Sequence, residues 1–84
     1  MPKYRKKPVE VEAVQFTGEN TDEIGHFAGL DARKAGREGR LEIKTLEGIM
    51  QVSPGDFVIR GVSGEHYPIK EHIFLETYDP VEVG

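Results

Sequence analysis

The chain contains no cysteine and no tryptophan, and aromatic residues make up only 8% of its 84 residues. Without cysteine, neither a disulfide nor a Cys-ligated zinc or iron–sulfur site can form, and a reducing compartment is favoured. A domain of this length buries only about 60–65% of the surface that its unfolded chain exposes. Because the core is therefore thin, we expect a homo-oligomer, either a dimer or a larger assembly.

Long apolar runs are also missing. No stretch approaches the roughly 18–20 apolar residues of a membrane-spanning helix. The N-terminal segment MPKYRKKPVEVEAV begins basic and then alternates with glutamate, so it lacks the unbroken apolar stretch of about 7–15 residues that a signal peptide requires. These absences predict an intracellular protein without membrane partners.

The common catalytic and phosphate-binding motifs do not occur. The chain has no phosphate-binding Gly-Lys-Ser/Thr loop, no Gly-x-Gly-x-x-Gly and no Gly-x-Ser-x-Gly. Ser53 and Ser63 both adjoin turns, where serine commonly makes local hydrogen bonds. The histidines His26, His66 and His72 form neither a His-x-His nor a His-Glu-x-x-His pair. We therefore predict no enzymatic activity, no metal site and no cofactor.

The charge is distributed unevenly along the chain. The net charge of −4 argues against bulk nucleic-acid binding. Most basic residues nevertheless fall into two clusters: Lys3, Arg5, Lys6 and Lys7, and Arg33, Lys34, Arg37 and Arg40. Two basic clusters in an acidic chain are compatible with local binding of a phosphorylated ligand. We expect residues 1–7 to form a basic, solvated and mobile terminus. The alternatives are that it wraps around a partner subunit or contacts nucleic acid.

Alternating apolar residues and turn signals predict a small α+β domain that spans residues 1–84. The predicted strands cover residues 8–17, 41–45, 49–53, 57–62 and 65–69. They are expected to form a mainly antiparallel sheet of about four to six strands, either open or curled towards a barrel.

One early helix and one loop complete the predicted domain. Asn20 is a suitable N-cap for a helix over residues 20–30, with Glu23 as its capping-box partner. Residues 31–40, DARKAGREGR, have almost no apolar content and predict a basic loop, with a helical turn at 32–35 as the alternative. Residues 70–75 predict one further helical turn, and Val81 and Val83 are candidates for a last short strand.

The segment from Val52 to Lys70 gives the strongest structural signal. Pro54-Gly55-Asp56 predicts a type II turn, since glycine readily adopts the positive φ that this turn needs at its third position. Arg60 follows within the most apolar strand. It either points into a polar pocket, or lies on an exposed face and pairs with a glutamate on the neighbouring strand.

The same segment holds most of the candidate binding site. A guanidinium fork, a stacking ring and further cations on one sheet face would suit a phosphate joined to a flat group. The candidate ligand-binding residues are Lys44, Arg60, His66, Tyr67 and Lys70. Secondary basic contacts are expected from Arg33, Lys34 and Arg37. The alternative for Tyr67 is a place in the core.

Several blocks, namely YRKKPVEVEAVQFTGEN, TLEG, PGDFVIRGV and the GE-x-YP-x-K stretch, resemble a group of short bacteriophage and prophage proteins. Only about residues 24–40 look variable against that group. His66 stands where an aromatic residue is usual, and Ile69 stands where cysteine occurs. The resemblance implies no catalytic activity and assigns no functional residue.

A phage context nevertheless orders the functional hypotheses. Small non-catalytic phage proteins often act by binding, and some sequester the nucleotide signals of host immunity. The working hypothesis is a binding protein in the host cytoplasm that sequesters a phosphorylated small molecule or cyclic nucleotide. The alternatives are a protein–protein interaction module that inhibits or redirects a host protein through a sheet edge, and a minor structural or packaging accessory.

Overall fold

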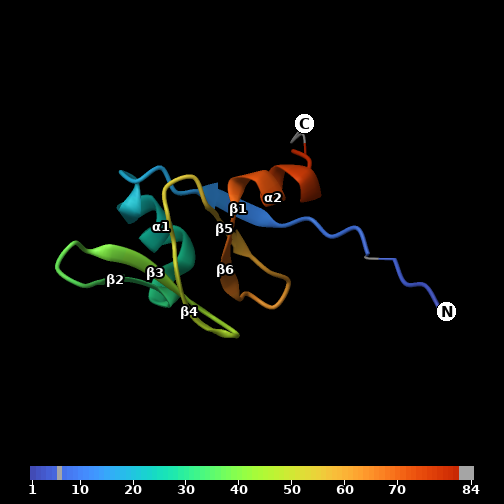
Figure 1. Ribbon diagram of the computed structural model, residues 1–84, viewed down its shortest axis with the longest axis horizontal. Helices are drawn as coiled ribbons and strands as arrows, with labels where there is room; N and C mark the ends of the chain where they lie inside the picture. The colour runs from blue at the N-terminus through green and yellow to red at the C-terminus, as the bar shows by residue number, and fades with distance from the viewer. Residues whose placement is uncertain (6, 82–84) are drawn as a thin grey trace.

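A computed structural model describes residues 1–5 and 7–81. Its elements, in chain order, are β1 (Glu12–Gln15), α1 (Thr21–Ala28), η1 (Gly29–Asp31), β2 (Ala32–Ala35), β3 (Arg40–Thr45), β4 (Gly48–Gln51), β5 (Phe57–Arg60), β6 (His66–Ile69) and α2 (Glu71–Thr77). The strands are antiparallel and form two three-stranded sheets, β1-β5-β6 and β2-β3-β4 (Figure 1). The α+β prediction is confirmed. The barrel alternative is wrong, because within the described residues the two sheets remain separate.

The main core lies between the two sheets and α1. Ile24 and Ala28 on one face of α1 pack with Leu41 and Ile43 of β3 and with Val58 of β5. The spacing of the first pair puts both on one side of a helix, and alternation along β3 sends its two apolar residues to the same face. This small set of buried aliphatic side chains provides most of the hydrophobic stabilisation.

A second, smaller apolar layer covers the outer face of the β1-β5-β6 sheet. The rings of Phe57 and Phe74 stack with centroids 3.9 Å apart, which fixes α2 against β5. Ile59 is fully buried, although it points away from the main core because it alternates with Val58. The single helical turn predicted over 70–75 is therefore a two-turn helix, since an aromatic side chain anchors it on the sheet.

The basic loop predicted over residues 31–40 is wrong in its first half. Ala32–Ala35 forms β2 and pairs antiparallel with β3, with Ala32 opposite Ile43. The helical turn considered for these residues is also wrong. The segment has little apolar content of its own, so its strand conformation depends on the hydrogen bonds that β3 offers and on the contact with α1.

Both ends of the chain also depart from prediction. The first strand begins at Glu12 rather than at residue 8, so the segment before it lies outside the sheet. Val81 is exposed and not in a strand, and Val83 lies outside the described residues. Asn20 is the N-cap of α1 as predicted, but its side-chain nitrogen donates to Glu23 Oε1 at 2.6 Å instead of completing a capping box.

Candidate functional site

Strand register divides the predicted site between two faces of one sheet. Arg60 lies opposite His66, and Ile59 lies opposite Tyr67. Successive residues of a strand point to opposite faces, so Arg60 and His66 share the inner face while Tyr67 is on the outer one. The five predicted ligand-binding residues therefore do not converge on a single surface.

Arg60 is the centre of a polar network. Its Nε donates to His66 Nε2 at 3.4 Å, and one terminal nitrogen donates to Glu12 Oε1 at 3.0 Å. The other terminal nitrogen donates to the Phe27 carbonyl oxygen at 2.8 Å, and the guanidinium carbon lies 4.4 Å from the centroid of the Phe27 ring. The sequence alternative for Arg60, a pair with a glutamate of the neighbouring strand, is confirmed. All three guanidinium nitrogens are engaged within the protein.

His66 connects the Arg60 network to Asp31 in η1. The residue is only 8% exposed, and its Nδ1 lies 2.8 Å from Asp31 Oδ2. A neutral imidazole with the proton on Nδ1 donates to Asp31 and accepts from Arg60, which satisfies both ring nitrogens. The ring therefore stabilises the contact between β6 and η1, and its geometry does not resemble that of a free general base.

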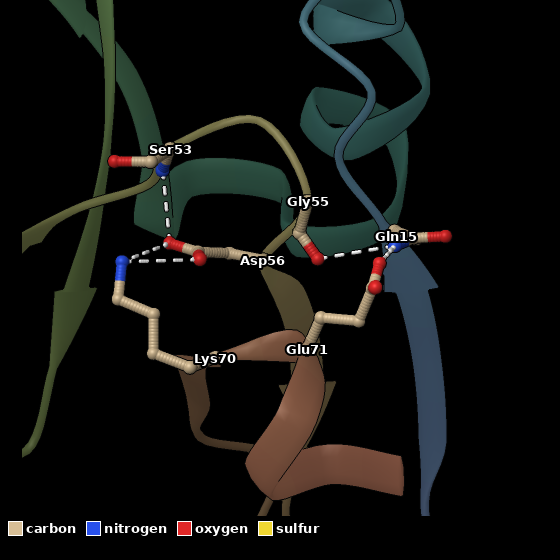
Figure 2. Close-up of polar contacts among 6 residues, drawn as sticks. All are labelled: Gln15, Ser53, Gly55, Asp56, Lys70 and Glu71. Carbon is tan, nitrogen blue, oxygen red and sulfur yellow. Dashed lines mark hydrogen bonds and ion pairs between the residues drawn. The ribbon is translucent and has the colours of Figure 1, made fainter.

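Lys70 follows the end of β6 opposite to His66. Its ammonium contacts the Asp56 carboxylate (Figure 2). Asp56, 5% exposed, accepts hydrogen bonds from the Ser53 backbone nitrogen at 2.9 Å and from Lys70 Nζ at 3.2 Å. The Asp56 backbone nitrogen donates to the Ser53 carbonyl at 3.0 Å, and Gly55 has a φ of +98°. The predicted turn and its glycine conformation are confirmed. Lys70 compensates a buried carboxylate inside this turn.

Gln15 ties the same turn to β1 and α2 (Figure 2). Its side-chain nitrogen donates to the Gly55 carbonyl oxygen at 3.1 Å and also to a carboxylate oxygen of Glu71. No buried side-chain nitrogen or oxygen of the described residues, including those around the turn, lacks a hydrogen-bond partner. The cluster has an adequate structural explanation and resembles no catalytic arrangement.

The last two predicted ligand-binding residues, Tyr67 and Lys44, line two neighbouring hollows that share Thr45, Leu46 and Glu65. Burial raises the pKa of Tyr67 above its ordinary value of 10.0, and a hydrogen bond with the Tyr78 side chain raises it further. Lys44 lines a hollow of about 240 Å³ together with Asp31 and Glu65, so the cation there faces carboxylates.

Two of the three secondary basic contacts, Arg33 and Lys34, line one hollow beside α1, and Arg60 does not line it. Arg33 Nε lies 3.0 Å from Glu42 Oε1 across the β2–β3 pair. Lys34 lines hollows beside α1, and Arg37 is exposed in the turn between β2 and β3. No shared surface unites these three cations with Arg60.

An apolar groove lies where the two sheets meet, and sequence reasoning missed it. We call it the β4–β6 groove, because it lies between the β3–β4 hairpin and β6, and its volume is about 410 Å³. Its lining residues are Thr45, Leu46, Glu47, Met50, Glu65, Tyr67 and Pro68. Four of these side chains are mainly apolar and two are carboxylates, so the groove combines an apolar floor with acidic groups and no cation.

Both flanking strands end their sheets. Within the described residues β4 pairs only with β3, and β6 pairs only with β5. All four residues of β4 are exposed, and the strand GIMQ carries no charge. Exposed apolar edges of this kind favour the addition of another strand. Met50 shares a strand face with Val52, yet Val52 is buried while Met50 is 43% exposed at the sheet edge.

Neither a metal-ligand cluster nor a membrane-spanning helix occurs among the described residues. The part of the chain that the structure describes contains no cluster of three or more His, Asp or Glu side chains that could hold a metal ion. Within that same part, no helix is both long and apolar enough to cross a membrane. No family model, curated protein or solved structure matches this chain at a significant level.

Proposed function

We propose that this protein is a small non-catalytic binding module that holds an extended protein segment in the β4–β6 groove. The observation that carries the proposal is an apolar groove that runs along β4, a strand that pairs only with β3 within the described residues and so keeps free ladder positions on its outer edge. On the other side the groove is closed by β6, where Pro68 lacks a backbone donor. An extended peptide can add to such an edge through main-chain hydrogen bonds, while the adjacent groove accepts alternate side chains.

The groove lining indicates the chemistry of the bound segment. Leu46 and Met50 offer apolar surface, and methionine adapts its shape to different partners. Glu47 and Glu65 supply negative charge beside that surface. A segment that alternates apolar and basic residues would match both features, whereas a phosphate would meet two carboxylates. In the host cytoplasm that the phage resemblance implies, the segment would belong to a protein whose activity is inhibited or redirected.

Nucleotide sequestration remains a prediction, and the arrangement of the cations favours it less. A phosphate at Arg60 would have to replace Glu12 or the Phe27 carbonyl, since both already accept from the guanidinium. Lys44 and Lys70 each lie beside carboxylates elsewhere. The test must therefore distinguish nucleotide sequestration from binding of a protein segment.

Site-specific photo-crosslinking in host cells tests the proposal. A photoreactive residue at Leu46, in the groove, is compared with one at Leu30, which is also exposed but lies outside it. We expect discrete covalent adducts with a protein from position 46 only, lost when Glu47 and Glu65 are both changed to lysine. Equal labelling from both positions would contradict the proposal.

A thermal-shift screen against cyclic and linear nucleotides provides the second arm. Under the groove proposal no nucleotide raises the melting temperature, because no cation lines the groove. An increase of several degrees would instead support sequestration if Arg60→Ala, although destabilised, still unfolds cooperatively and shows no such increase. Chromatography of the recovered nucleotide would separate binding from cleavage.

A further inference from the structure

We propose that the β4–β6 groove binds the N-terminal arm, residues 1–11, of a second copy of this chain, and that two copies exchange arms in a reciprocal homodimer. The inference rests on the proposed function, because it uses the same groove, and it adds the identity of one partner. It also specifies how the homo-oligomer expected from the thin core would be assembled.

The arm is exposed along most of its length, and only its last residues, Val9 to Val11, line a hollow together with α2. Every described residue from 1 to 10 is exposed, including Tyr4 at 94%. The arm runs straight away from β1 (Figure 1). The radius of gyration is 14.0 Å, compared with about 12 Å for a compact domain of this length. An extended segment with an exposed tyrosine and valine gains free energy if a partner covers it.

The composition of the arm complements the groove. Lys3, Arg5 and Lys7 alternate along the chain, and an extended backbone places all three on one side. Tyr4 then points to the other side. Its ring can lie on Leu46 and Met50 while the cations reach Glu47 and Glu65, and the arm backbone can pair with the free edge of β4.

Chain direction favours a second copy over the arm's own groove. The arm leaves from β1, which is the edge of its sheet opposite β6. It would have to reverse direction and cross the sheet end to reach the groove of the same molecule. A twofold axis lets each arm continue outward into the other copy, and it gives both copies identical contacts.

A charge-swap experiment tests the exchange with full-length protein. One variant reverses the arm (Lys3→Glu with Arg5→Glu), and a second reverses the groove (Glu47→Lys with Glu65→Lys). Mass is measured by light scattering over a range of concentrations. We expect the wild type to dimerise, and each variant alone to show at least about a tenfold weaker dimer. An equimolar mixture should restore the dimer, because each arm then meets a groove of opposite charge.

The mixture separates exchange from intramolecular folding. If each arm folded into its own groove, a chain carrying all four substitutions would regain the native contact, but the mixture would not form heterodimers. A monomeric wild type at all concentrations would overturn the inference, as would a dimer that the arm variant leaves unchanged. Circular dichroism and melting curves confirm that each variant is folded.

A matched leucine pair locates the contact. Leu46→Glu, in the groove, should weaken the dimer at least about tenfold, whereas Leu30→Glu should leave it unchanged. Equal effects would overturn the assignment of the groove. If Leu46 crosslinks to a host protein while the wild type remains monomeric, this inference fails and the proposed function survives. If Leu46 crosslinks to nothing and the dimer is also absent, both fail.

Discussion

The Arg60 network and the β4–β6 groove differ in whether their side chains already have partners within the fold. The network is charged, yet Arg60, His66 and Asp31 satisfy one another within the fold. The groove is mainly apolar, yet its flanking strands have free ladder positions and its side chains meet solvent. Charged residues in an apolar strand therefore mark internal structure here, whereas ordinary aliphatic residues at a sheet edge mark the open surface.

The largest expected loss of stability follows replacement of Arg60 by alanine. Arg60→Ala leaves His66 Nε2 and the Phe27 carbonyl without their donor, and it should lower the free energy of unfolding by about 2–3 kcal/mol. Urea denaturation measures the change. Leu46→Glu, the matched change in the groove, should shift the value by no more than about 0.5 kcal/mol. A similar loss for both variants would refute the contrast.

A double-mutant cycle sharpens the comparison at the Gly55 turn, which lies at the opposite end of β5 and β6 from the Arg60 network. Lys70→Met removes the cation but keeps most of the stem, and it leaves the buried Asp56 carboxylate with less compensation. We expect a cost of about 1 kcal/mol, because Lys70 itself is well exposed. Adding Asp56→Asn should recover part of that loss, as measured by urea denaturation. Strict additivity of the two single changes would show that the pair contributes nothing.

The smallest expected effect is a change in how the melting temperature depends on alkaline pH, and it comes from Tyr67 on the outer face of the β1-β5-β6 sheet. Burial raises the pKa of Tyr67 in the folded state above 10.0, so the unfolded chain releases this proton at a lower pH than the folded one. Stability from Tyr67 is therefore complete below pH 10 and is lost as pH rises through the folded-state pKa. Melting temperatures from pH 8 to 11 should fall less steeply for Tyr67→Phe than for the wild type. Parallel pH profiles would contradict this account.

Much of the fold was predictable because local patterns were strong. The alternation in β3, the PGD turn with its glycine and the helix that follows Asn20 all lie where the sequence places them. The strand Ala32–Ala35 was not predictable, since its own residues prefer no strand and only pairing with β3 decides it. The division of the strands into two sheets also depends on long-range pairing that periodicity does not encode.

The candidate site was less accessible to sequence reasoning. The sequence correctly offered a pair with a glutamate as one environment for Arg60, but could not choose between that pair and a pocket. Tyr67 and His66 are adjacent in the chain and lie on opposite faces, a consequence of strand alternation once the register is known. Alternation places Met50 and Val52 on one strand face, but it does not show that β4 is an edge strand on which Met50 is exposed while Val52 is buried.

The sequence by itself determined the α+β class, the turn at Gly55 and the basic character of the arm, because these follow from local backbone preferences and composition. The tertiary structure alone decided that Arg60 is held by its neighbours, that the candidate cations are dispersed, and that an apolar groove opens between two sheet edges. The physical reason is that partner choice depends on which residues distant in the chain are brought within hydrogen-bonding distance, and strand pairing sets that choice.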